Sequence, residues 1–110
     1  MERIEDRLLK RLDSADFVPF EPVTFKNGEE PLSNNCHENV RRYVVENPGH
    51  WRICGWLVSA GVQCDKHSIV GRAGGDPFDI TPLRAQTPFL THSGPEEQFD
   101  AAPAMCFLNP

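Results

Sequence analysis

The spacing of apolar residues predicts two helices in the first half of the chain. One stripe recurs at helical intervals near the N-terminus: Ile4, Leu8, Leu9 and Leu12. A second stripe predicts one apolar face of a later helix: Cys36, Val40, Tyr43 and Val44. Asn35 is a favourable N-cap, Glu38 can complete a capping box, and Pro48-Gly49 ends the helix. Cys36 is therefore expected at the first helical position, on the face turned toward a sheet.

Residues 51–59 and 67–72 have the composition of strands, with turns at Ala60-Gly61 and Gly74-Gly75. A short strand or bend is predicted over residues 77–80 and a last strand over 104–108. Residues 17–32 and 81–103 contain prolines and turn residues, which predicts an extended arm and a loop-rich stretch. We therefore expect an α+β fold in which the Cys-bearing helix packs on an antiparallel sheet.

The length of 110 residues fits a single domain covering residues 1–110. Within it, we expect an N-terminal helix and extended arm over 1–32, a core over 33–82, and a loop-rich tail with a final strand over 83–110. The hydrophobic share of 39% and the charged share of 25% are those of an ordinary globular protein.

The charge pattern excludes several kinds of partner. The net charge is −5 and no basic cluster exceeds Arg41-Arg42, which argues against a nucleic-acid partner. No apolar run reaches the length of a membrane span, about 20 residues, so no membrane partner is expected. The N-terminus is charged and lacks the apolar region of a Sec signal, which predicts a cytoplasmic protein with reduced cysteines. The sequence predicts no particular oligomeric state.

Cys36 stands where a cysteine gains chemical reactivity. The positive end of a helix dipole favours the thiolate, and the first-turn N–H groups can receive a developing oxyanion. A nucleophile of this kind also needs a base and a group that orients the base. His37 follows directly, but successive helix side chains diverge by roughly 100°, so we expect it to point away.

His67 is the better candidate for the base, because a strand beginning at this residue and packed on the helix could bring its ring beside the thiol. Asp79 lies on the next extended piece after the Gly-Gly turn, where an antiparallel neighbour could hold the imidazole. The expected chemistry is attack of the Cys36 thiolate on an amide or ester carbonyl, followed by resolution of the thioester.

This order of groups resembles papain-like cysteine hydrolases, above all compact bacterial members such as the NlpC/P60 group and transglutaminase-like relatives. The matching pieces lie between Asn34 and Pro82: Asn-Asn-Cys-His-Glu-Asn, the Gly-Trp strand, His-Ser-Ile-Val and Asp-Ile-Thr-Pro. The resemblance implies Cys36 as nucleophile, His67 as general base and Asp79 as orienting residue. It further implies Asn34 or Asn35 at the oxyanion hole, Trp56 at the substrate, no cofactor, and a peptide, protein or small amide as substrate.

Two other functions stay open. A non-catalytic interaction domain of the same fold would use an exposed aromatic surface. Trp51 and Trp56 are five residues apart on one strand, which predicts that they face opposite sides, one buried and one exposed. A small zinc-binding domain would instead gather Cys36-His37 with Cys64 and His67, four nitrogen and sulfur ligands.

Overall fold

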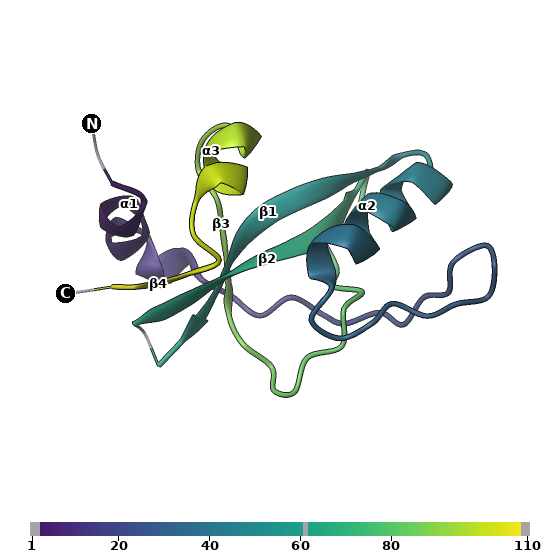
Figure 1. The fold of residues 1–110 in the computed structure, drawn as a ribbon, viewed down its shortest axis with the longest axis horizontal. Helices are drawn as coiled ribbons and strands as arrows, with labels where there is room; N and C mark the ends of the chain where they lie inside the picture. The colour runs from purple at the N-terminus through teal and green to yellow at the C-terminus, as the bar shows by residue number, and fades with distance from the viewer. Residues whose placement is uncertain (1–2, 61, 109–110) are drawn as a thin grey trace. The chain divides into compact units, whose positions relative to one another are not determined.

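The structure of this chain, a computed structural model, describes residues 3–60 and 62–108. A four-stranded antiparallel sheet in the order β3-β1-β2-β4 is accompanied by short helices (Figure 1). The elements in chain order are α1 (Ile4–Lys10), a 3-10 turn (Leu12–Ser14), α2 (Cys36–Glu46), β1 (His50–Ser59), β2 (Gln63–Arg72), β3 (Phe89–Thr91), α3 (Glu96–Ala101) and β4 (Met105–Phe107). The predicted α+β class is confirmed at this level.

Contacts between residues divide the described chain into two compact units. Unit 1 comprises residues 3–17, 54–60, 62–67 and 87–108, and unit 2 comprises residues 18–53 and 68–86. The two long strands β1 and β2 each contribute residues to both units. The expectation of a single domain over residues 1–110 stays a prediction.

The core of unit 1 forms around Trp56 on β1. Seven buried residues make up this cluster: Leu8, Trp56, Val58, Cys64, Leu90, Phe99 and Leu108. Short strands extend the sheet here, because β3 pairs with β1 through Trp56 and Leu90, and β4 pairs with β2 through Cys64 and Cys106. Leu8 comes from the predicted N-terminal helix, which packs its apolar stripe onto this core as its spacing indicates.

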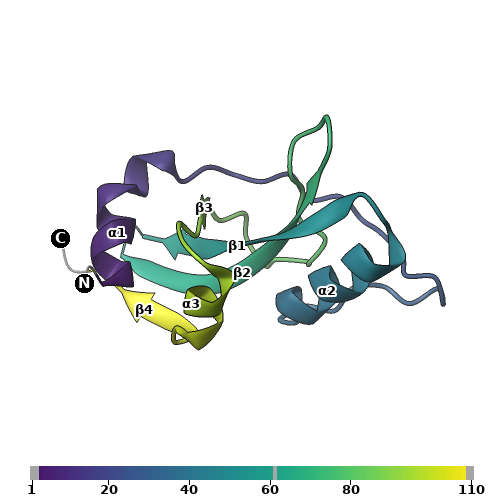
Figure 2. The same cartoon turned by 90° about the horizontal axis from the view of Figure 1, so that it is seen from above.

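The core of unit 2 forms where α2 packs on β2 and the segment that follows it. Val40 of α2 is fully buried in a cluster with Val70, Phe78 and Ile80. Both ribbon views show α2 beside the part of β1 and β2 that belongs to this unit (Figures 1 and 2). The helix that begins at Cys36 therefore packs on the sheet, as its apolar stripe predicts.

The structure corrects several boundaries. Residues 81–103 were expected as loops, yet they hold β3 and α3. These elements have three and six residues, too few for a period to be recognised in the sequence. The strand expected from His67 begins four residues earlier, at Gln63, because pairing with β4 extends it. Ala60 takes the left-handed conformation of a turn, with φ 52°, while Gly61 of the predicted turn lies outside the described residues.

The arm from Phe17 to Leu32 contains no helix and no strand, as expected, and joins the sheet through an isolated bridge at Phe20. Within residues 3–60 and 62–108, no helix combines the length and the apolar character needed to cross a membrane.

Candidate functional site

Cys36 is the first residue of α2, as predicted, and its side chain is half-buried. Asn34 precedes the helix in the left-handed region, with φ 61°, a conformation that Asn tolerates better than most residues. Asn35 occupies the N-cap position, but its side chain makes no capping hydrogen bond. Glu38 pairs with Arg41 at 2.6 Å. The expected capping box is therefore wrong, and the helix begins without side-chain capping.

The amides of Asn34 and Asn35 are exposed beside the helix start. Their expected role at an oxyanion hole stays a prediction.

His37 contacts the sheet, and the expectation that it points away from Cys36 stays a prediction. Its Nδ1 lies 2.6 Å from Oγ of the fully buried Ser68 on β2. Arg52 Nε donates to the same Ser68 oxygen at 3.0 Å, and another Arg52 nitrogen lies 3.5 Å from His37 Nδ1. Because the guanidinium can only donate, Ser68 Oγ accepts from Arg52 Nε and donates its hydroxyl proton to the single lone pair of His37 Nδ1.

The helical period explains this orientation. At about 100° per residue, Val40 lies roughly 40° from Cys36 and roughly 60° from His37 around the helix axis. Val40 is the centre of the packed face, since its side chain is fully buried. Cys36 and His37 thus stand at opposite margins of that face, and neither is directed fully into solvent. The sequence predicted the apolar face of this helix but gave no sign that His37 would contact the sheet at its margin.

Asp79 is buried in unit 2, and both its side chain and its backbone make hydrogen bonds there. Its Oδ1 accepts the backbone N–H of Thr81 at 3.0 Å. Its backbone pairs in parallel with the arm at Phe20, through hydrogen bonds to Pro19 and Glu21. The predicted short extended piece therefore exists, and the extended arm fixes its position.

Asn39 links the helix of Cys36 to the segment of Asp79, a role that the sequence analysis missed. Its buried amide nitrogen donates to Thr81 Oγ1 at 3.0 Å and to the carbonyl of Leu32 at 2.8 Å. The backbone N–H of Thr81 donates to the Asp79 carboxylate. Thr81 therefore links α2 to Asp79 through two hydrogen bonds, one at its hydroxyl and one at its backbone. Asn39 lies about one helical turn after Cys36, beside the apolar face of the helix. A polar residue at such a position is the feature of the sequence that could have indicated a buried hydrogen bond.

His67 lies in the middle of β2 and is buried. Its ring makes an edge-on contact with Phe89, with 6.2 Å between the ring centroids. This residue belongs to unit 1, whereas Cys36 and Asp79 belong to unit 2. The structure thus brings the Cys36 helix and Asp79 into one unit, and the contacts of His67 with both stay predictions.

Trp56 is the one candidate whose surroundings speak against its expected role. Its ring is fully buried in the core of unit 1, edge-on to Phe99, and so presents no surface to a substrate. Its indole Nε1 has no hydrogen-bond partner in the part of the chain that the structure describes. Trp51 is about half exposed (48%), so one tryptophan is buried and the other exposed, as expected.

The zinc alternative gains no support from the described residues. Among residues 3–60 and 62–108, no group of three or more His, Cys, Asp or Glu side chains is placed to hold a metal ion. Cys64 is buried in β2 opposite Cys106, and Cys36-His37 belongs to the other unit.

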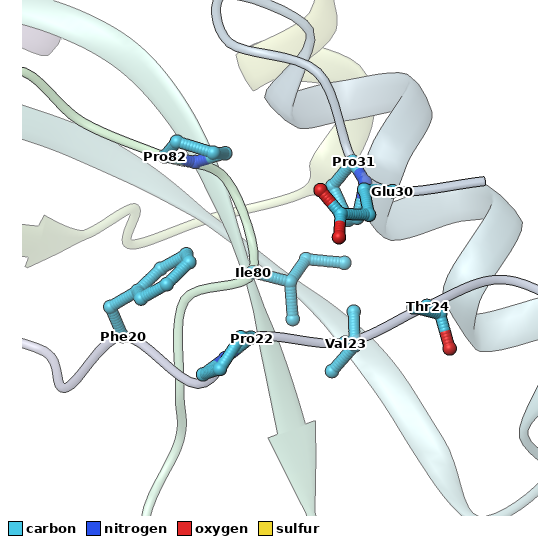
Figure 3. A pocket seen from close by; sticks show the side chains of 8 residues that line it. All are labelled: Phe20, Pro22, Val23, Thr24, Glu30, Pro31, Ile80 and Pro82. Carbon is cyan, nitrogen blue, oxygen red and sulfur yellow. The ribbon is translucent and has the colours of Figure 1, made fainter. Parts of the chain in front are cut away.

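Two small cavities in unit 2 adjoin the Asp79 segment. One, of about 180 Å³, is lined by Val18, Phe20, Asp79, Thr81, Leu83 and Gln86. The other, of about 250 Å³, lies between the arm, residues 30–31 and residues 80–82 (Figure 3). Its lining is mostly apolar: Phe20, Pro22, Val23, Thr24, Glu30, Pro31, Ile80 and Pro82. Each is smaller than a typical small-molecule site and has room for about one side chain.

No family model, no curated protein and no solved structure matches this chain.

Proposed function

We propose that this protein is a thiol-dependent hydrolase or acyltransferase that acts on an amide or ester bond. In this proposal Cys36 is the nucleophile, His67 the general base and Asp79 the group that orients the base. The observation that carries the proposal is the position of Cys36. It opens an eleven-residue helix that is tied, through Asn39 and Thr81, to a buried carboxylate.

The helix start supplies what a thiol nucleophile needs. The aligned peptide dipoles place partial positive charge at the first turn, and this favours a thiolate at Cys36. The same turn can donate N–H groups to the oxygen of a tetrahedral intermediate. Asn34 and Asn35 stand directly before Cys36 and can add a side-chain amide donor.

The other thiols are poor competitors for this role. Burial, followed by the neighbouring Cys106 and Asp65, raises the pKa of Cys64 to about 12. Burial also raises the pKa of Cys106. Both thiols therefore stay protonated at neutral pH, which makes them weak nucleophiles.

The proposed reaction begins when the base takes the thiol proton and the Cys36 thiolate attacks the carbonyl carbon. The tetrahedral intermediate expels the amine or alcohol, which receives the proton from the imidazolium. Water or an amine then attacks the thioester and releases Cys36. Hydrolysis, deamidation and acyl transfer share this first half. The cavity that Asp79 and Thr81 line has room for one side chain of the substrate.

An activated acyl probe, such as a p-nitrophenyl ester, tests the proposal by mass spectrometry of the trapped thioester. The wild-type protein should acquire one acyl group on Cys36, and Cys36→Ala should acquire none. Cys54→Ala is the matched control, because Cys54 is also half-buried and belongs to unit 1. His37→Ala tests the other histidine at the helix start and should retain acylation. A folded Cys36→Ala variant that is acylated as fast as the wild type would overturn the proposal.

A further inference from the structure

Two cysteines of unit 1 face each other across neighbouring strands. Cys64 of β2 and Cys106 of β4 are direct partners in the antiparallel register. Backbone hydrogen bonds join Lys66 to Ala104 and Leu108 to Val62, two residues to either side of this pair. Since hydrogen-bonded pairs alternate along an antiparallel ladder, Cys64 and Cys106 form such a pair, for which the Cα atoms are typically about 5.5 Å apart. Disulfides span Cα separations of about 4.4–6.8 Å.

The two thiols already contact each other, because Cys64 donates a hydrogen bond to the Cys106 sulfur. Cys64 is fully buried, and Cys106 is half-buried. An external reagent can therefore reach Cys106, while Cys64 lies behind it. This is the arrangement of an attacking and a resolving cysteine.

We propose that Cys64 and Cys106 are a site of reversible oxidation, which forms a disulfide on exposure to a small-molecule disulfide such as oxidised glutathione. The proposal is independent of the function proposed for Cys36.

The step is a thiol–disulfide exchange in two stages. Because burial raises the pKa of Cys106, the exchange is slow at neutral pH and faster at alkaline pH: the minor thiolate form of Cys106 attacks one sulfur of oxidised glutathione, forms a mixed disulfide and releases one reduced glutathione. The Cys64 thiolate then attacks the Cys106 sulfur, which forms the bond between β2 and β4 and releases the second glutathione. The two protein thiols are oxidised, the oxidised glutathione is reduced, and the two thiol protons end on the two glutathione molecules.

The test incubates the folded full-length chain with oxidised glutathione, blocks the remaining thiols with N-ethylmaleimide and measures the intact mass. Titratable thiols should fall from four to two, with a mass loss of two hydrogens and no retained glutathione. Cleavage by chymotrypsin after Trp56 or Leu57 separates Cys54 from Cys64, so the linked peptides should carry Cys64 and Cys106. Cys54→Ser should still form the bond, and Cys106→Ser should retain no intramolecular disulfide.

The proposal fails if the folded chain keeps all four thiols under conditions in which the urea-unfolded chain cross-links. It fails equally if the mapped bond involves Cys54 or Cys36. Should Cys106→Ser not fold, the peptide map of the wild-type protein decides the question without any variant.

Discussion

At the scale of single residues, the four cysteines differ most in how far each thiol is removed from water. Limiting iodoacetamide should label Cys36 first and Cys64 last. Cys36 lies at a helix start, whereas burial raises the pKa of Cys64 to about 12 and also raises that of Cys106. The labelled positions can be read by peptide mass spectrometry after brief exposure at mildly acidic pH. Equal labelling of all four thiols, or preferential labelling of Cys64, would contradict this prediction.

Replacement of His67 and replacement of Asp79 should both lower the rate of acylation, each for a different reason. His67→Ala removes the proposed base and should lower the acylation rate by about 10²–10⁴-fold. Asp79→Asn should lower the rate by up to about 10⁴-fold, because the Asn oxygen still accepts the Thr81 N–H but the uncharged amide favours the wrong imidazole tautomer. Stopped-flow acylation rates of both variants, with circular dichroism as the control for folding, measure both effects. Similar rates for His67→Ala and the wild type would exclude His67 as the base.

At the scale of elements, Asn39 supplies buried hydrogen bonds between α2 and the segments beside it. Asn39→Ala should lower the free energy of unfolding by about 1–3 kcal/mol, because it removes the partner of the buried Thr81 hydroxyl and the part-buried hydrogen bond to the Leu32 carbonyl. Asn35→Ala is the matched control on the same helix. Its side chain is exposed and makes no capping bond, so its effect should stay within about 0.5 kcal/mol.

Urea unfolding at neutral pH compares the two variants. The result would contradict the structure if Asn35→Ala proved the more destabilising. A loss of acylation without loss of stability in Asn35→Ala would instead support the expected role of this amide at the oxyanion hole.

At the scale of the whole molecule, two groups of unit 1 should limit stability at opposite ends of the pH range. Burial lowers the pKa of His92 below its usual 6.5, so the unfolded chain binds more protons and stability should fall as the pH drops below that value. Cys64 keeps its proton up to about pH 12 when folded and loses it near pH 9.0 when unfolded. Stability should therefore also fall as the pH rises above about 9.

Urea midpoints measured from acidic to alkaline pH test both limits. His92→Gln should weaken the dependence on the acidic side, and Cys64→Ala should weaken it on the alkaline side. An alkaline slope that is unchanged in Cys64→Ala would show that another group causes it.

The sequence by itself determined the elements whose signal is local and long enough to repeat. The eleven residues of α2 carry three turns of apolar spacing, and Pro48-Gly49 cannot continue a helix, so its position with Cys36 first was predictable. The two-residue period of a strand predicts one buried and one exposed tryptophan, and Trp56 is buried while Trp51 is exposed. The thiolate character expected of Cys36 also depends only on its place in its own helix, whereas the base proposed for it comes from a distant strand.

Only the tertiary structure decided the features that depend on partners distant in the sequence. β3 and β4 have three residues each and exist because β1 and β2 offer them backbone hydrogen bonds. His37 turns toward the sheet because the packed face is centred on Val40, and Asn39 finds its partners at Leu32 and Thr81. A periodic pattern of apolar residues predicts which side chains share one face of a helix or of a strand. It does not predict which distant segment packs against that face, and this packing determines which polar groups can form hydrogen bonds.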